Sequence, residues 1–488
     1  MWDSFLDKKG ALALAIVLII IYFPRCFGLA LHHFGRAKYR STPRSQYPET
    51  IDLYKIAVIL PVVDHNSDNL LPTIESILIN RPQQLYVMVT GQEAFDKVEA
   101  EMDPLREKFG YTQINVGAVN ITNKRRQIAH ALKYIEPRVH SMTVIAEQGT
   151  YWPSRFLMSA CCPFDDPEVA AVTVPKRAHL QPSNCIWDKV KAHLFSFYYS
   201  VQAEDNRAVN SFDGSALFGG GATLVRTQYL NDDRFKREFE HEKWFFGRSG
   251  ALKGDEHFFL NRYFLSGNKH VYFQDSPEAT VSVEMNTVGH FLSEFLRETR
   301  NNWKTSWNMV VTSHWLLIRR RHVIYPAAAF MTWWPNIFSF VLLADILSVI
   351  MAFNYDLLND EFLHAWLAVH GTVVGLQAMV GLFVVIRMHR SDGSDFNIVV
   401  TLLCLLLSLP FQYALEFVKI AAILTFWKAD TEERASDDVE TTGDSELPWS
   451  WAWEFDHDDN EFLNPATWFM ITMVDEDDAI EVHEHVEK

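Results

Sequence analysis

Short apolar runs alternate with helix-like segments between residues 55 and 146, and this alternation constrains the fold more than any other feature of the chain. The runs are rich in Val, Ile and Leu, as buried parallel strands are, and the intervening segments have helical spacing of apolar residues. Such alternation predicts a doubly wound, mainly parallel α/β sheet. The expected strands are 55–63, 84–90, 112–119 and 141–146, and the expected helices are 70–79, 95–109 and 123–135.

Polar residues follow the expected strands directly. Ligands of open α/β sheets bind beyond the carboxyl ends of the strands, so Asp64, Thr90 and Glu147 should lie along one edge with the segment 120–124. That last segment opens a helix with free backbone N–H groups and nearby cations, which suits a diphosphate. An ordinary basic helix start would give the same pattern.

Two later segments could carry chemistry. The glycine run 219–221 precedes an expected strand and would let a backbone approach a ligand closely, although a tight turn explains it equally well. Asp255 and Glu256 open an apolar helix. A helix cap accounts for one of these acids, and a general base would account for the other.

Four long apolar stretches predict a membrane protein. Each is near or above the ~20 residues that span a bilayer core, and the first lacks the small-residue cleavage pattern of a signal peptide. Basic residues flank the spans on one side, which places the region between spans one and two in the cytosol. The expected parts are an outer tail 1–9, span 10–31, cytosolic domain 32–287, interfacial helices 288–322, spans 323–427 and tail 428–488.

Charge is concentrated at the C-terminal end. Residues 428–488 contain 20 acidic against 3 basic residues, so this tail accounts for the whole net charge of −17. The tail is expected to be solvated and partly disordered, and nothing in the chain indicates nucleic-acid binding. The five cysteines show no zinc-binding spacing and fit a reducing compartment. Glu416 and Lys419, in the last apolar stretch, are spaced to pair on one helix face.

Four motifs resemble, in order, those of processive family-2 glycosyltransferases, and most closely those of fungal polysaccharide synthases of the capsule or hyaluronan-synthase-like type. Residues 123–127 resemble the Asn-Lys-Arg-x-Gln element, and 147–153 the Asp-Asp-Asp-x-x-Trp-Pro element. Residues 219–223 are similar to the Ser-Gly-x-Thr-Ala element, and 254–256 to Gly-Asp-Asp. The resemblance covers about residues 10–425. It implies a cytosolic GT-A-like, Rossmann-like domain joined to a transmembrane bundle of about four spans.

The resemblance also implies an activity. A sugar would pass from a UDP-sugar to a growing glycan acceptor, with Mg²⁺ or Mn²⁺ on the diphosphate, at a bilayer that is expected to be the plasma membrane. Glu256 would be the catalytic base and Asp255 its acidic neighbour. The expected metal ligand is Glu147; the donor residues are Asp64, Lys124, Arg125, Arg297, Arg300 and Trp303; the acceptor residues are Trp152, Gly219, Gly220 and Gly221.

The chain departs from the family pattern in its metal motif. Gln148 and Gly149 stand where the family has acids, so one carboxylate remains, and Gln148 could offer only a neutral oxygen. The family's Gln-x-x-Arg-Trp element becomes 297–301, with Trp303 displaced by two residues. Two hypotheses follow: an active membrane glycosyltransferase, or a weakly active or inactive homologue that serves as a membrane scaffold or regulatory partner.

Overall fold

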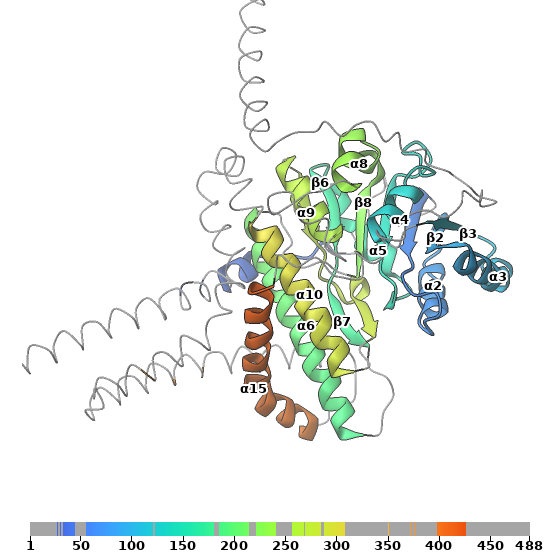
Figure 1. Cartoon of the computed structure of the whole chain (residues 1–488). Coiled ribbons are helices and arrows are strands. Elements are labelled where there is room, and N and C mark those ends of the chain that lie inside the picture. The colour runs from blue at the N-terminus through green and yellow to red at the C-terminus, as the bar shows by residue number, and fades with distance from the viewer. Residues whose placement is uncertain are drawn as a thin grey trace, which may run out of the picture.

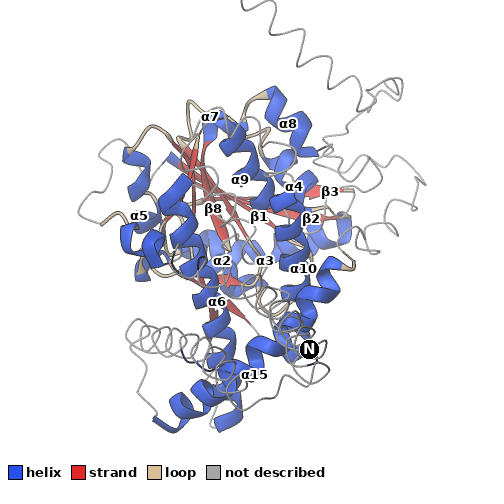
Figure 2. Cartoon of the chain, turned by 90° about the vertical axis from the view of Figure 1, so that its left-hand side faces the viewer, coloured by secondary structure: helices blue, strands red, loops and turns tan. Residues whose placement is uncertain are grey.

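The fold is taken from a computed structural model, which describes most of the α/β region and two helical parts beside it. The described residues are 33–43, 55–120, 123–179, 185–213, 221–240, 256–267, 269–284, 287–307 and 398–425, with a few single positions elsewhere. One large sheet lies at the centre of these residues, and helices cover both of its faces (Figures 1 and 2).

A seven-stranded mixed sheet forms the centre of the molecule, in the order β3-β2-β1-β4-β8-β6-β9. The first four neighbours are parallel, as the alternation predicts. β8 runs antiparallel to both β4 and β6, whereas β6 and β9 pair parallel, so the sheet is mainly parallel as predicted and mixed because of β8. The strands are β1 (Ile56–Pro61), β2 (Gln84–Thr90), β3 (Gln113–Val119), β4 (Met142–Ala146), β6 (Val169–Thr173), β8 (Ala222–Arg226) and β9 (His270–Phe273).

A second, three-stranded sheet lies beyond the end of β4. Its order is β5 (Thr150–Tyr151), β10 (Val281–Glu284) and β7 (Lys176–His179). β5 follows β4 after three residues, and β7 follows β6 after two. Because both connections are short, this sheet holds the ends of β4 and β6 close to one another and brings Lys176 to the edge where Glu147 lies.

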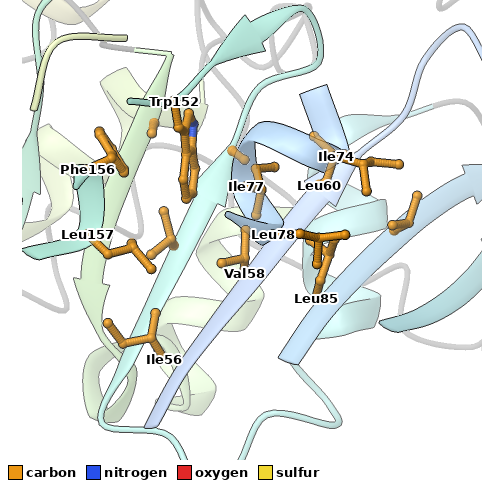
Figure 3. Packing of buried hydrophobic residues seen from close by; sticks show 14 of the residues in the cluster. Ile56, Val58, Leu60, Ile74, Ile77, Leu78, Leu85, Trp152, Phe156 and Leu157 are labelled. Carbon is orange, nitrogen blue, oxygen red and sulfur yellow. The ribbon is translucent and has the colours of Figure 1, made fainter. Parts of the chain in front are cut away.

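Apolar side chains cover both faces of the large sheet. Alternate residues of β1 point to opposite faces, so Ile56, Val58 and Leu60 belong to one cluster, whereas Ala57 and Ile59 belong to another. The first cluster packs under α2 (Leu70–Leu78), α3 (Gln92–Lys108) and α5 (Phe156–Ala160), as Figure 3 shows for part of it, and the second under α4 (Lys124–Ala131), α8 (Asp233–Glu240) and α9 (Glu256–Ser266). Both faces are therefore closed, and the strand ends are left for ligands.

Three helices pack together beside the sheet: α6 (Ile186–Asp213), α10 (Val288–Trp307) and α15 (Ile398–Ile423) (Figure 1). Phe195 of α6 stacks on Phe291 of α10, with ring centroids 4.2 Å apart, and Leu415 of α15 joins the same cluster. The amphipathic segment expected at a membrane surface thus buries its aromatic face against other helices of the protein.

The transmembrane bundle finds no support among the described residues. The first three expected spans lie outside them. In the fourth, no single helix is long and apolar enough to cross a bilayer, although the pair Leu402–Ser408 and Tyr413–Ile423, bent by 41°, meets the length and composition criteria together. Glu416 and Lys419 form the predicted ion pair, 3.0 Å apart.

Candidate functional site

Glu147 is fixed by its backbone at the carboxyl end of β4. Its N–H donates to the carbonyl of Gly221, 3.0 Å away, and its own carbonyl accepts a hydrogen bond from the Thr150 hydroxyl at 2.6 Å. A Cβ on Gly221 would lie 2.5 Å from the Thr150 side chain, so close packing requires glycine there. Gly221, predicted to bind an acceptor, is therefore a residue that positions Glu147, and its contact with an acceptor stays a prediction.

Gln148 and Gly149 have structural reasons for not being acids. The Gln148 side-chain oxygen accepts hydrogen bonds from the backbone N–H groups of Val63 and Asp64, at 3.0 and 3.2 Å, and its amide donates to the Asp64 carbonyl at 2.6 Å. A carboxylate could not make that donation. Gly149 has φ near +80°, a conformation that favours glycine. The Gln148 oxygen considered above as a metal ligand is engaged with backbone.

Three cations surround the Glu147 carboxylate. Lys176 at the start of β7 lies 3.5 Å from Oε2, while Lys124 of α4 and Arg297 of α10 each lie 3.4 Å from Oε1. The side chains are mostly buried, and that of Lys176 is only 8% exposed. Burial opposes ionisation of Glu147, but Lys176, Lys124 and Arg297 outweigh it and hold its pKa well below the usual range. The carboxylate is therefore fully charged at neutral pH.

Lys176 is shared between Glu147 and Glu298 of α10. Its Nζ lies 3.0 Å from Glu298 Oε1, and burial, which disfavours the ammonium, is outweighed by both carboxylates, so its pKa is raised well above the ordinary value. The other oxygen of Glu298 accepts hydrogen bonds from Tyr198 and Gln202 of α6, at 3.2 and 2.9 Å. The network thus ties α10 and α6 to the edge of the sheet.

Glu256 at the start of α9 differs from Glu147 in its surroundings. Its side chain is 3% exposed, its Oε1 lies 3.6 Å from Lys124, and its Oε2 has no hydrogen-bond partner among the described residues. His257 beside it shares a short hydrogen bond with Thr223 through Nδ1, and its Nε2 also has no partner there. Burial lowers the pKa of His257, so the ring is neutral near pH 7. Two buried polar atoms on residues next to each other in sequence thus have no hydrogen-bond partner among the described residues.

Of the six predicted donor residues, the structure brings Lys124 and Arg297 to Glu147. Arg125 turns into the core instead, where it donates to the Phe239 carbonyl at 3.1 Å and lies over the Phe259 ring. Arg300 points to α15 and donates to the Thr425 hydroxyl at 2.9 Å. Asp64 is exposed, with its carboxylate accepting from the Asn66 N–H at 2.9 Å. Trp303 is half-buried on α10.

Of the remaining predicted residues, the structure describes Trp152 alone. Trp152 is 5% exposed and packs on Phe156 with ring centroids 4.4 Å apart, as part of the core that Figure 3 shows. Its contact with an acceptor stays a prediction. Asp255, Gly219 and Gly220 lie outside the described residues.

Sequence reasoning missed four members of the network with acidic or basic side chains: Lys176, Glu298, His257 and Glu294, whose Oε1 lies 2.6 Å from Arg297. Glu294 lies three residues before Arg297, and this helical spacing of opposite charges could have found it, whereas His257 and Glu298 are only adjacent to a named residue. Lys176 had no comparable signal, since it stands in no motif and is placed by the pairing of β7 with β10.

The described residues do not fit a divalent metal ion. Mg²⁺ and Mn²⁺ favour several oxygen ligands at short distance. Among the residues that the structure describes, no three His, Cys, Asp or Glu side chains are grouped closely enough to hold a metal. Glu147 also has cations on both of its oxygens, and these would repel a second positive charge. The arrangement can instead neutralise an anion and hold one carboxylate ready to accept a proton.

Comparisons with known proteins point to the glycosyltransferases. No protein-family model matches the chain. A protein of Gibberella zeae named Type 2 glycosyltransferase is 26% identical over 297 residues, covering 61% of this chain and 54% of the relative. One of the same name from Pyricularia oryzae is 26% identical over 306 residues, covering 62% and 59%. This chain thus spans little more than half the length of these curated relatives, whose shared name supports a type 2 glycosyltransferase.

A solved structure shares the fold. The mannosyltransferase PcManGT from Pyrobaculum calidifontis, in complex with GDP-Man and Mn²⁺, superposes with a TM-score of 0.50 at 14% identity, covering 86% of this chain and 99% of that one. The likeness supports a GT-A-like α/β fold with a mixed sheet for this chain.

Proposed function

We propose that this chain is a family-2 glycosyltransferase that transfers a sugar from a UDP-sugar to a growing extracellular or cell-wall polysaccharide. The observation that carries the proposal is Glu256, a buried carboxylate with one oxygen unpartnered among the described residues, 3.6 Å from a lysine at the carboxyl edge of the sheet. A carboxylate in this setting can take the proton of an acceptor hydroxyl as that hydroxyl attacks the sugar.

The donor's diphosphate would lie beside Lys124 and Arg297. Both side chains reach Glu147 at the carboxyl end of β4, the edge where α/β sheets bind ligands, and both can stabilise the negative charge that develops on the leaving nucleoside diphosphate. The structurally similar mannosyltransferase was solved with GDP-Man, which supports a nucleotide-sugar donor. The choice of UDP rests on the resemblance to polysaccharide synthases.

A membrane location is part of the proposal. The apolar stretches of the sequence support it, and so does α15, whose exposed surface includes Leu402, Leu406 and Phe417, each 59–72% exposed. Apolar residues exposed in this number on one helix favour contact with lipid or with further helices of the chain. The polymer would then be delivered across the membrane, which we expect to be the plasma membrane.

A second candidate is a non-catalytic homologue that acts as a membrane scaffold or regulatory partner. One observation favours it: both oxygens of Glu147 and the side chain of Gln148 are engaged inside the protein. A network closed in this way can stabilise a fold without ever binding a donor.

Turnover of defined nucleotide sugars separates the two candidates. The full chain would be purified in detergent and incubated with a panel of UDP-sugars, with GDP-mannose and with no donor, both with and without added divalent cations. We expect release of UDP from at least one UDP-sugar, accompanied by transfer of its radiolabelled sugar to a product larger than the donor.

If the protein releases GDP from GDP-mannose but no UDP from any UDP-sugar, it is still a glycosyltransferase, but its donor is GDP-mannose. If folded protein turns over none of these donors under either metal condition, the scaffold function replaces the enzymatic one.

A further inference from the structure

The Glu147 carboxylate has a counter-ion where a divalent metal would be expected. Lys176 lies 3.5 Å from Oε2 of Glu147 and 3.0 Å from Oε1 of Glu298, with 8% of its side chain exposed. An ammonium group that bridges two carboxylates neutralises charge at this position as a bound cation would. It is covalently part of the chain, so no ion has to be recruited.

The other two cations are held differently. Lys124 and Arg297 each lie 3.4 Å from Oε1 of Glu147, which is longer than the ~2.7–2.9 Å of a strong charge-assisted hydrogen bond. They belong to separate helices, α4 and α10, which reach the carboxylate from different parts of the fold. Lys176 has a shorter contact that holds it on Glu298, and Arg297 has one of 2.6 Å that holds it on Glu294, while its Nε has no partner among the described residues. Lys124 has only long contacts, 3.4 Å to Glu147 and 3.6 Å to Glu256, so of the three cations it can turn to phosphate oxygens at the smallest cost.

Charge balance requires exchange and not simple addition. Four carboxylates of the described network (Glu147, Glu256, Glu294 and Glu298) face three cations, so there is no spare positive charge for a diphosphate. If Lys124 turns to the phosphates, Glu147 keeps Lys176 and Arg297 as partners, whereas Glu256 gives up its one described ion pair. The Glu147 carboxylate is then never left without a cation, which would be costly.

We propose that Lys176 takes the place of a divalent cation beside Glu147, and that Lys124 and Arg297 bind the donor diphosphate directly, so that the nucleotide binds without a metal. This inference rests on the proposed function, because it concerns how the same site holds its donor. It also explains why Gln148 and Gly149 are tolerated: with an internal cation on Glu147, further metal-binding acids are not needed.

The test is the binding of UDP to the full-length protein in detergent, measured by calorimetry. One sample is stripped and kept in EDTA, one contains Mn²⁺, and one contains Mg²⁺; GDP is measured in parallel. We expect the UDP dissociation constants to agree within about twofold. If UDP binds more than tenfold more weakly in EDTA and Mn²⁺ restores the affinity, the inference is overturned, but the proposed glycosyltransferase function is not. If neither UDP nor GDP binds under any condition, the inference and the proposed function fail together.

Variants distinguish a metal substitute from a merely structural lysine. Removing the ammonium in Lys176→Met opens the Oε2 side of Glu147, so UDP binding should become at least threefold tighter with Mn²⁺ than in EDTA. Lys176→Arg should stay metal-independent. Lys108→Met is the matched control, because that lysine pairs with Glu75 on the surface and should behave as the unchanged protein does. Metal-independent affinity in folded Lys176→Met, equal to that of Lys176→Arg, would overturn the role given to Lys176.

Discussion

Two buried glutamates at the same edge of the molecule have opposite surroundings. Glu147, at the end of β4, has three cations within 3.5 Å and both oxygens engaged. Glu256, at the start of α9, is more deeply buried, but its one described ion pair is at 3.6 Å and its Oε2 has no partner in the described part of the chain. Lys124 is the residue that the two carboxylates share.

The difference separates a carboxylate that holds the site together from one that can react. An acid that several cations neutralise contributes to stability and accepts a proton poorly, because protonation would break its ion pairs. An acid with a free oxygen in a buried setting is a better proton acceptor for a substrate hydroxyl. We therefore expect substitutions of Glu147 to act on stability and substitutions of Glu256 to act on turnover.

Removal of the Glu147 charge should have the largest effect on stability. Glu147→Gln would leave Lys176, Lys124 and Arg297 facing Glu298 and Glu256 without their shared partner. Breaking a buried ion pair from one side costs about 3 kcal/mol or more of unfolding free energy. Thermal unfolding of the purified protein measures this as a lower midpoint.

A double substitution provides the control for that result. Lys176→Met alone should also destabilise, and combined with Glu147→Gln it should cost clearly less than the sum of the two single changes, because the two residues interact directly. Additive effects would show that the two side chains do not depend on one another.

A smaller loss is expected from restoring an acid next to Glu147. Gln148→Glu keeps acceptors for the Val63 and Asp64 N–H groups but sets a carboxylate against the Asp64 carbonyl. The loss of one hydrogen bond predicts about 1 kcal/mol of destabilisation. The substitution Gln228→Glu, at an exposed glutamine, controls for the added charge. Unchanged stability of Gln148→Glu would mean that the amide does not hold the loop after β1.

The pH dependence of stability is the smallest expected effect, and its direction follows from the pKa shifts of Glu147 and Lys176. Because the pKa of Glu147 is depressed in the folded state, its contribution is fully present above the unfolded value of about 4.3 and is lost as pH falls through the lower, folded pKa. The pKa of Lys176 is raised in the folded state, so its contribution to stability is fully present below the unfolded value of about 10.4 and is lost as pH rises through the higher, folded pKa.

The stability difference between the unchanged protein and Glu147→Gln should therefore be constant from about pH 5 to pH 10 and shrink only below about pH 4. Unfolding midpoints across this range test it. A difference that already shrinks at pH 6 would contradict a depressed pKa.

The parallel half of the sheet could be predicted from the sequence because its signal is local. Each strand of 55–146 is an apolar run with its own helix, and the structure confirms β1, β2, β3 and β4 and the helices between them. β8 could not be oriented from sequence, since its direction depends on pairing with β4 and β6, which lie far away along the chain.

The site was predictable where function is tied to a strand end or a helix start. Lys124, Glu147 and Glu256 were found in this way, and the structure brings them together. The side chain of Arg125 faces the aromatic core, because neighbours on a helix point about 100° apart, and its contact with a donor stays a prediction. Lys176 could not be predicted from the sequence, because its position depends on the pairing of the short strand β7 with β10.

The most direct test of the contrast is the transfer rate of Glu256→Gln at saturating donor, measured with its UDP affinity in the same preparation. Glu278→Gln is the control, since that acid lies on the surface near Arg155. The account predicts a fall in rate of about 100-fold or more, with UDP affinity and unfolding temperature nearly unchanged. A Glu256→Gln protein that transfers sugar as fast as the control would contradict the assignment of Glu256 as the catalytic base.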